Sequence, residues 1–283
     1  MKKMSIILSL CIALFLTGCA VTETATDAST KDNSLTKSEA IVTLAKPVAL
    51  QIAKQRIINL GSAFNEGVIE GDVELLNIAF TKDVEIHYSV EGGAWKTVKA
   101  GFVKMKDTTS EIWHFNFKAF TVPNTGLWTS AACEFAIKYT VGGKTYWDNN
   151  NGSNYKISTS GSNPTYSEVI LGTLNVKLYE ANAYKNQWPA YANSLNYSVV
   201  IKNLNFTKKV TLVCSTDNWT TTYTQPLSFS KSLTGSDELW TINSLLALDI
   251  TSLQFAIAYD VNGVTYWDNN DGLNYTLTVP GNL

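Results

Sequence analysis

The sequence predicts an all-β protein with two tandem immunoglobulin-like antiparallel β-sandwiches after a short N-terminal leader. Three observations lead to this fold class. An internal repeat divides the chain into two halves, short β-branched segments recur in each half, and glycine-containing turns connect them. About 110 residues of short strands in each half is typical of a sandwich of this outline.

The N-terminus has the pattern of a secretion signal. Lys2 and Lys3 precede an apolar run from Ile6 to Leu16. This run has the length of a signal-peptide core and is too short to span a bilayer. It ends in Leu16-Thr17-Gly18-Cys19, which resembles the bacterial lipobox, where the cysteine carries diacylglycerol and becomes the mature N-terminus. The alternative is an ordinary secretory leader in which Cys19 is incidental.

These features predict a protein that is lipid-anchored to the bacterial cell envelope. Ala20 follows the cysteine instead of aspartate, which resembles the enterobacterial signal for the outer membrane. The anchored chain would then stand on the periplasmic or the surface face. A polar tether, two modules and a polar linker follow, and the predicted boundaries are 1–18 for the lipoprotein signal peptide, 19–42 for the tether, 43–158 for the first module, 159–168 for the linker and 169–283 for the second module.

Composition excludes several classes of function. The chain of 283 residues has 22 basic and 24 acidic side chains, a net charge of −2. Nucleic-acid binding requires an excess of positive charge on one face, so we expect no nucleic-acid partner. Only two histidines, His87 and His114, are present, which argues against a histidine-rich metal site or a catalytic triad. Cys133 and Cys214 do not recur in the repeat, and we interpret them as small buried hydrophobic residues rather than a disulfide framework.

The repeat is clearest at the end of each half. The segment TYWDNNNGSNY from Thr145 matches TYWDNNDGLNY from Thr265 at nine of eleven positions. Further pairs share the strand patterns Asn-x-x-Phe-x-Lys-x-Val and FAIxY, at Asn77 and Asn203 and at Phe135 and Phe255. Two modules of one fold follow from these matches.

Each module reads as a series of strands and tight turns. Val84–Tyr88 and Val210–Cys214 are short β-branched runs, and Phe135–Val141 alternates before Gly142-Gly143. In the second half Asn262-Gly263 stands at the same turn. Asn-Gly between apolar runs is a strong hairpin signal.

The loop that follows Trp147, and its copy after Trp267, carries the residues that point to a ligand. Several carboxamides beside a tryptophan suit a sugar, because amides pair with neighbouring hydroxyls and an indole covers the C–H face of a pyranose. The structural alternative is a capped loop of asparagines. Calcium is a third interpretation, but the loop lacks the spacing of glycine and glutamate that a hand-type site needs, so we expect no metal and no cofactor. Asp148 and Asp268 are expected to hydrogen-bond their own turn.

The order of Asn-x-x-Phe-x-Lys-x-Val, a single tryptophan, FAIxY and YWDNNxGxNY closely resembles the family 21 carbohydrate-binding module. This resemblance covers about Thr43 to Ile157 and Val169 to the C-terminus. It implies a non-catalytic sandwich of about eight strands with two α-glucan sites. A further aromatic of the first site in some members is here Ala136 or Ala256.

The family's site residues are carried over by position. By resemblance, the first site is Trp95, Trp147, Asn149, Asn150 and Asn154 in the first module, and Trp219, Trp267, Asn269, Asn270 and Asn274 in the second. The second site is Asn77 and Phe80, and Asn203 and Phe206, with Phe102 and Phe229 as looser candidates. From the residues alone, Phe80 and Phe206 fit a core or a binding role equally well, whereas Trp113, Trp240, Tyr139, Tyr155, Tyr259 and Tyr275 fit the core better.

The predicted function is therefore non-catalytic binding of starch, glycogen or maltodextrins at the cell envelope. Its expected partners are α-glucans, the membrane through the lipid on Cys19, and a separate amylolytic enzyme or transporter. The alternative is an envelope adhesin or scaffold that binds another glycan or a protein. A glycoside hydrolase is disfavoured, since it needs two carboxylates beside one bond and only Asp148 and Asp268 recur, one in each loop.

Overall fold

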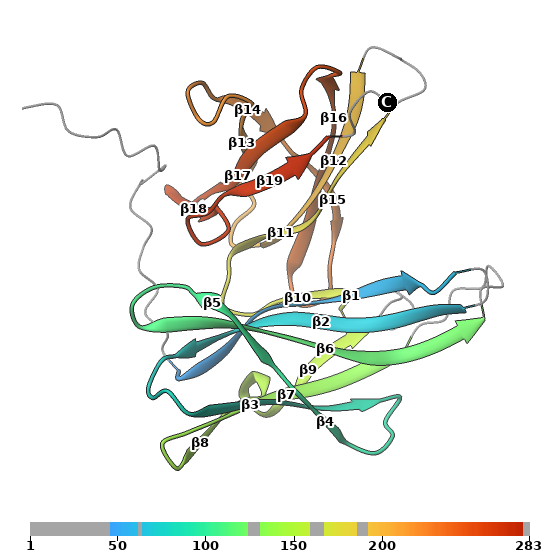
Figure 1. Cartoon of the computed structure of the whole chain (residues 1–283), viewed down its shortest axis with the longest axis vertical. Coiled ribbons are helices and arrows are strands. Elements are labelled where there is room, and N and C mark those ends of the chain that lie inside the picture. Colours follow the sequence, from blue (N-terminus) through green and yellow to red (C-terminus); the bar gives the residue numbers. More distant parts are fainter. Residues whose placement is uncertain (1–45, 62–63, 124–130, 159–166, 186–191, 280–283) are drawn as a thin grey trace, which may run out of the picture. The chain divides into compact units, whose positions relative to one another are not determined.

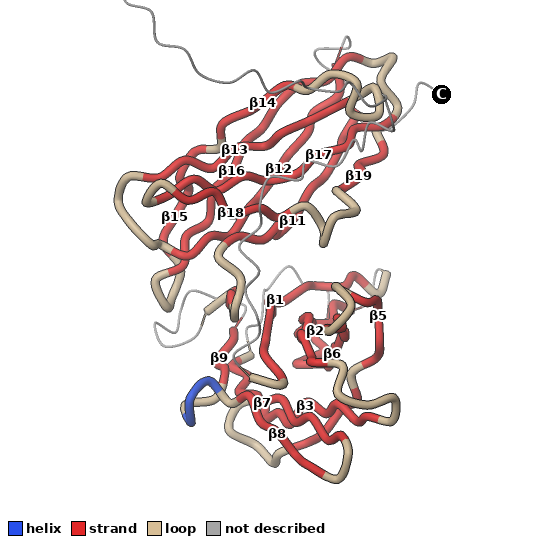
Figure 2. Tube along the Cα trace, turned by 90° about the vertical axis from the view of Figure 1, so that its left-hand side faces the viewer, coloured by secondary structure: helices blue, strands red, loops and turns tan. Residues whose placement is uncertain are grey.

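The computed structural model describes residues 46–61, 64–123, 131–158, 167–185 and 192–279. These residues form antiparallel β-sheets with one 3-10 turn, and in each module the strands run in two layers (Figures 1 and 2). The predicted all-β fold with two tandem sandwiches is confirmed. The predicted signal peptide, the tether and Cys19 lie outside the described residues, as does most of the linker. Within the described part of the chain, no helix is long and apolar enough to cross a membrane.

The first module is a sandwich of two sheets. One sheet has the order β10-β1-β2-β6-β5, and the other has the order β4-β3-β7-β8 with β9 also paired to β7. The strands are β1 (Val48–Asn59), β2 (Phe64–Leu76), β3 (Lys82–Val90), β4 (Lys96–Lys99), β5 (Gly101–Met105), β6 (Ser110–Pro123), β7 (Ala132–Val141), β8 (Lys144–Asp148), β9 (Tyr155–Ser158) and β10 (Val169–Leu171), and the 3-10 turn η1 is Asn150–Gly152.

The second module repeats this arrangement. Its sheets have the orders β11-β12-β16-β15 and β14-β13-β17-β18, with β19 also paired to β17. The strands are β11 (Val176–Lys185), β12 (Ala192–Lys202), β13 (Lys208–Ser215), β14 (Tyr223–Pro226), β15 (Ser228–Ser232), β16 (Asp237–Ala247), β17 (Ser252–Val261), β18 (Val264–Asp268) and β19 (Tyr275–Thr278).

Two register shifts in the strand pairing occur at equivalent positions of the two modules. The pairing of β1 with β2 shifts register after Leu50, and the pairing of β11 with β12 shifts after Leu178. A second shift follows Phe102 in the first module and Phe229 in the second. The two modules therefore share these two bulges as well as their strand order. A third shift, after Gly67 in the pairing of β2 with β6, has no counterpart between β12 and β16.

Each sandwich encloses its own apolar core. In the first module Phe115, Phe135 and Tyr139 are almost fully buried, as are Phe255 and Tyr259 in the second. The hydroxyl of Tyr139 donates to the Leu76 carbonyl at 2.8 Å and that of Tyr259 to the Lys202 carbonyl at 2.7 Å. These tyrosines therefore fill the core, as expected, and their hydroxyl groups also tie the two sheets of each module.

The two described cysteines are both free and fully buried. Cys133 and Cys214 are 0% exposed. Burial raises the pKa of each thiol to about 12, so both remain protonated and unreactive at neutral pH. The interpretation of these residues as small hydrophobic core residues is confirmed.

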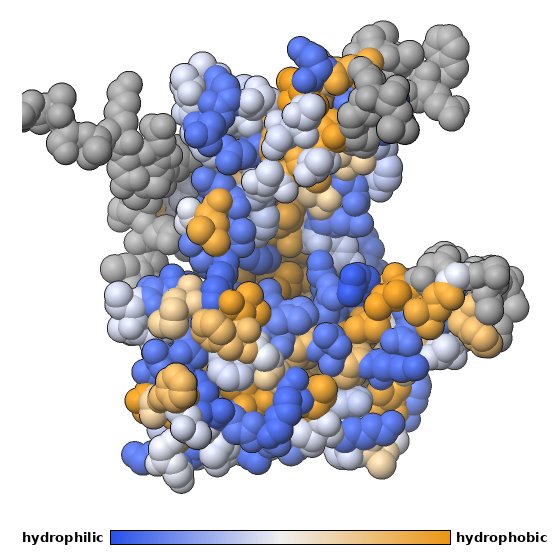
Figure 3. All heavy atoms as spheres, in the orientation of Figure 1, coloured by the Kyte–Doolittle hydropathy of each residue, from blue (hydrophilic) through white to orange (hydrophobic). Residues whose placement is uncertain are grey.

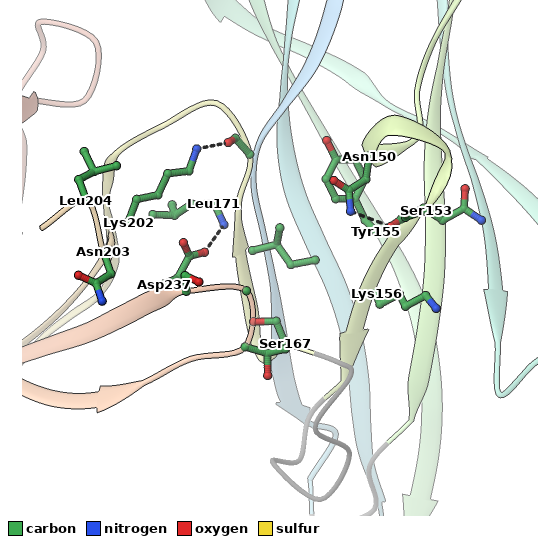
Figure 4. Close-up of a pocket in the computed structure, with 16 residues that line it drawn as sticks. Asn150, Ser153, Tyr155, Lys156, Ser167, Leu171, Lys202, Asn203, Leu204 and Asp237 are labelled. Atoms are coloured by element: carbon green, nitrogen blue, oxygen red, sulfur yellow. Dashed lines mark hydrogen bonds between the residues drawn. The ribbon is translucent and has the colours of Figure 1, made fainter.

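A buried carboxyl group in the second module couples its stability to pH. Asp237 begins β16, is 6% exposed and accepts a hydrogen bond from the backbone amide of Leu171 at 3.2 Å (Figure 4). Lys202, its partner across the ladder, donates to the Gly172 carbonyl instead. Burial raises the pKa of Asp237 to about 6, because the charged form loses its water.

We expect Asp237→Asn to remove a pH dependence from the second module. The folded state binds this proton more tightly than the unfolded chain. The stabilisation is therefore complete below about pH 4 and is lost as the pH rises through about 6, a change of roughly 3 kcal/mol for two pKa units. Urea denaturation at pH 4.5 and pH 7.5 measures the free energy of unfolding of both proteins. Parallel changes with pH in the two proteins would contradict the assignment.

Candidate functional site

The aspartate of the first repeated loop is a buried clamp. Asp148 is 4% exposed, and its Oδ2 accepts hydrogen bonds from the Leu50 amide at 2.8 Å and the Tyr155 hydroxyl at 2.7 Å. Leu50 stands at the bulge of β1. The expected contact with its own turn is present but long, 3.4 Å from the Asn150 amide to Oδ1. The carboxylate thus fastens the loop to the opposite sheet.

The second loop uses the same clamp. Asp268 is 6% exposed and accepts from the Leu178 amide, at the bulge of β11, at 2.6 Å. Tyr275 Oη lies 2.9 Å from each carboxylate oxygen of Asp268. Burial and the carboxylate charge raise the pKa of this hydroxyl. Because the Asp268 carboxylate already accepts hydrogen bonds from the Leu178 amide and the Tyr275 hydroxyl, it is poorly suited to act as the acid or the base of a glycosidase.

The asparagines of the first loop build its backbone shape. Asn149 Oδ1 accepts from the Gly152 amide at 3.0 Å, and Asn150 Nδ2 donates to the Asn154 carbonyl at 3.1 Å (Figure 4). Asn150, Asn151 and Asn154 have φ of 52°, 57° and 53°. Asparagine tolerates this left-handed region better than most residues. The capped-loop interpretation is therefore confirmed for one polar atom of each amide, the oxygen of Asn149 and the nitrogen of Asn150.

The second loop repeats the same bonds. Asn269 Oδ1 accepts from the Gly272 amide at 2.9 Å, and Asn270 Nδ2 donates to the Asn274 carbonyl at 3.1 Å. Asp271 takes the place of the third asparagine with the same left-handed backbone, at a φ of 55°. The two loops therefore share one backbone scaffold. They differ in that Lys104 Nζ donates to Asn270 Oδ1 at 3.2 Å and pairs with Asp271 at 2.9 Å in the second loop.

The first-site tryptophans lie at the margins of one sheet. In the first module Trp95 precedes β4 and is 53% exposed, and Trp147 on β8 is 46% exposed. Trp219 and Trp267 in the second module are half-buried. The backbone of Trp219 is held by a hydrogen bond of 2.8 Å from its amide to Ser215 Oγ. Exposed indoles beside a shaped amide loop can stack on a flat apolar ligand face.

His87 adds to the first module's face a side chain that sequence reasoning missed. Its ring centroid lies 5.1 Å from that of Trp147, in an edge-on arrangement. Ala136, the residue that replaces the further aromatic of some family members, is paired with His87 across the ladder. The repeat gave no signal for this contact, because the second module has Val213 at the position of His87.

The second candidate site is marked by two fully exposed rings. Phe80 is 100% exposed and Phe206 is 95% exposed, each in the connection that follows β2 or β12. This exposure excludes a core role, an alternative that the sequence left open. Phe102 and Phe229, the looser candidates, are 54% and 53% exposed, so they too are open to a ligand.

A buried ion pair positions the asparagine of this site in the first module. Lys82 Nζ donates to Asn77 Oδ1 and to Glu111 Oε1, both at 2.7 Å. Glu111 Oε2 in turn accepts from Trp113 Nε1 at 2.8 Å. The edge of Trp113 then meets Phe102, with ring centroids 6.2 Å apart. One hydrogen-bonded network thus extends from the exposed Asn77 to the core side of the sheet.

The second module repeats this network in full. Lys208 binds Asn203 and, at 2.8 Å, Glu238, which accepts from Trp240 Nε1 at 2.9 Å. The Phe229 and Trp240 rings are also 6.2 Å apart. The interpretation of Trp113 and Trp240 as core residues is confirmed in part, because both are half-buried and pack against the core.

The face of the molecule drawn in Figure 3 is mixed in hydropathy. Figure 3 shows small apolar groups among polar ones on the face in view. Among the described residues, no group of three or more histidine, cysteine, aspartate or glutamate side chains is arranged to hold a metal ion. The groups that the candidate sites offer to a ligand are exposed aromatic rings and amides, and the amides can bind hydroxyl groups.

Comparisons with known proteins support a carbohydrate-binding family. The bovine (Bos taurus) protein phosphatase 1 regulatory subunit 3C is 32% identical over 87 residues, 28% of this chain and 27% of the relative. Glucoamylase 1 of Rhizopus oryzae is 31% identical over 118 residues, 40% of this chain and 18% of that enzyme. The chain therefore matches well under half the length of these relatives.

A solved structure of the starch-binding domain of Rhizopus oryzae glucoamylase, in complex with β-cyclodextrin and maltoheptaose, is 28% identical with a TM-score of 0.30. The similarity covers 42% of this chain and 98% of that domain. The carbohydrate/starch-binding module (family 21) matches residues 51–158 and 172–278, which is most of the chain and once in each sandwich. The chain belongs to this family, in two copies.

Proposed function

We propose that this protein binds α-glucans without catalysis, through both modules. The observation that carries the proposal is the recurrence of exposed aromatic rings at matching positions, above all Phe80 and Phe206. A phenylalanine ring in full contact with water does not stabilise the fold, whereas it can cover the apolar face of a pyranose. The family membership supports this ligand class.

Each module would offer two surfaces to a glucan. The first combines the two tryptophans with the asparagine loop, where Asn149 Nδ2 and Asn150 Oδ1 are the amide atoms that the loop's own hydrogen bonds do not use. The second combines the exposed phenylalanine with the lysine-held asparagine. Single sites of this kind are weak, and linked sites commonly gain about 10²–10⁴ in affinity where geometry allows.

We further propose that the modules act at a bacterial cell envelope, attached through a lipid on Cys19. The leader and its lipobox-like end support this location. A binding protein placed there would hold starch, glycogen or maltodextrins for a separate amylolytic enzyme or transporter. An adhesin that uses the same faces for another glycan or a protein is the competing function.

Titration of the chain from Ala20 onwards tests the binding proposal. Calorimetry with maltoheptaose and β-cyclodextrin is expected to detect binding by the wild type and weaker binding by the Trp147→Ala, Trp267→Ala variant. Circular dichroism checks that the variant is folded. Absence of binding to both sugars and to granular starch would overturn the α-glucan proposal and favour the adhesin.

The same chain tests avidity with a long glucan. A variant with the rings of one module removed, Phe206→Ala with Trp219→Ala and Trp267→Ala, should bind amylose roughly 10²-fold more weakly than the wild type if both modules engage one polymer. Both proteins should bind maltoheptaose at the remaining first-module sites with similar affinity. Equal affinity for amylose would rule out avidity.

A further inference from the structure

The strand that carries His87 lies between the segments that carry the two exposed tryptophans of the first module. The sheet has the order β4-β3-β7-β8, and His87 on β3 pairs with Thr97 on β4 and Ala136 on β7. Trp95 precedes β4 on one side of it, and Trp147 stands on β8 on the other. Because Ala136 is small, the Trp147 ring reaches His87 across it, with centroids 5.1 Å apart. A ligand that extends from Trp147 on β8 to the start of β4 therefore crosses the strand of His87.

The charged groups on this face are already paired. On the strand of His87, Glu85 Oε2 lies 3.7 Å from His87 Nε2. Lys138 on β7 contacts Glu85 at 2.9 Å and Lys99 on β4 contacts it at 3.0 Å. These two lysines lower the pKa of Glu85 to about 2, so it stays ionised. Glu134, the other acidic group that β7 contributes, pairs with Lys156 at 3.5 Å, and β8 contributes Thr145 and Trp147 to the face.

In the second module the positions that correspond to His87, Glu85 and Lys138 carry no ionisable side chain. Val213 stands at the position of His87 and pairs with Ala256. Thr211 and Ala258 replace Glu85 and Lys138. The two modules therefore have matching tryptophans, but the side chains on the strands between them differ in chemistry. At these positions the side chains are ionisable in the first module and uncharged in the second.

We propose that His87 is part of the glucan-binding surface of the first module and makes its affinity depend on pH, while the second module binds independently of pH over the same range. The inference rests on the proposed function. His87 Nε2 is already buried without a hydrogen-bond partner, and the side chain as a whole is 31% exposed. A sugar that covers the exposed part of the ring removes its remaining water, and this penalises the protonated form more than the neutral one. Histidine is the side chain that ordinarily changes charge between pH 5 and 8.

The test isolates the first site of the first module in the chain from Ala20. Phe80→Ala, Phe206→Ala and Trp267→Ala together remove the other proposed stacking rings except Trp219 and the looser candidates Phe102 and Phe229. Calorimetry with maltoheptaose at pH 5.0 and pH 8.0 is expected to show roughly 5–10-fold weaker binding at the lower pH. His87→Val in this background, which copies Val213, should bind with equal affinity at both pH values.

The reciprocal background is the matched control. Phe80→Ala, Phe206→Ala and Trp147→Ala leave the second module's first site, which should bind equally at both pH values. His114, the other histidine, is bonded to Asp72 on the opposite sheet at 2.9 Å and is unchanged in every variant. Binding that is independent of pH in the first background, stronger at pH 5.0, or still pH-dependent after His87→Val would overturn the inference alone. Absence of binding by the wild type at either pH would overturn the proposed function as well.

Discussion

Replacing Phe80 and Phe206 by alanine is expected to weaken binding of maltoheptaose while the free energy of unfolding stays unchanged. Both side chains are almost completely exposed, so their removal takes no apolar surface out of the core. A sugar that covers one face of such a ring gains about 1–2 kcal/mol, and losing that contact weakens each second site roughly 5–30-fold. Calorimetry in the Trp147→Ala, Trp267→Ala background reads this effect without the first sites.

Two controls separate a stacking role from other causes. Phe64→Ala removes a phenyl ring that is 46% exposed and lies outside both proposed sites, so it should leave binding unchanged. Phe135→Ala removes a fully buried ring and should destabilise the first module by about 3–5 kcal/mol. Unchanged binding by the Phe80→Ala, Phe206→Ala variant would exclude these rings from the glucan surface.

The repeat explains why the architecture was predictable. Val84–Tyr88 and Val210–Cys214 carry the β-branched residues of a strand, and they lie within β3 and β13. The expected turns at Gly142-Gly143 and Asn262-Gly263 have left-handed φ values, 56° and 54° at their first residues. These strands and turns depend on local sequence. Because the same patterns occur in both halves, they are not chance matches.

Exposure and side-chain contacts were less predictable because they depend on packing between distant strands. From the sequence Phe80 fits a core or a binding role equally well. In the structure the chain leaves β2 after Leu76, and the Phe80 ring is exposed to water. The contact of His87 with Trp147 joins β3 and β8 across an intervening strand. No local pattern reports such a contact.

The asparagine loop illustrates how one residue type can serve both fold and ligand. Asn149 caps the turn with its oxygen and Asn150 closes it with its nitrogen. From the sequence alone, a sugar site and a capped loop were alternative interpretations of these asparagines. In the structure the two are compatible, because each amide uses one polar atom for the loop and keeps a second for hydrogen bonding.

Breaking the buried ion pair of the first module is expected to destabilise that module strongly. The side chains of Lys82 and Glu111 are only 4% and 8% exposed, and their charged atoms are 2.7 Å apart. Lys82→Met leaves the Glu111 carboxylate buried without its counter-charge, which costs about 3–5 kcal/mol. Urea denaturation followed by tryptophan fluorescence measures the loss, and Lys208→Met tests the equivalent pair in the second module.

A second substitution distinguishes the loss of charge balance from the loss of packing. Lys82→Met with Glu111→Gln keeps an acceptor for Trp113 Nε1 but removes the unpaired charge, so it should recover a large part of the stability. Asn77 loses its lysine donor in both proteins, so binding at the second site should remain weakened even when stability returns. A cost below about 1 kcal/mol for Lys82→Met would place this pair among solvent-screened ion pairs. Asn77 would then have to be held by the backbone bond from its amide to the Thr109 carbonyl rather than by Lys82.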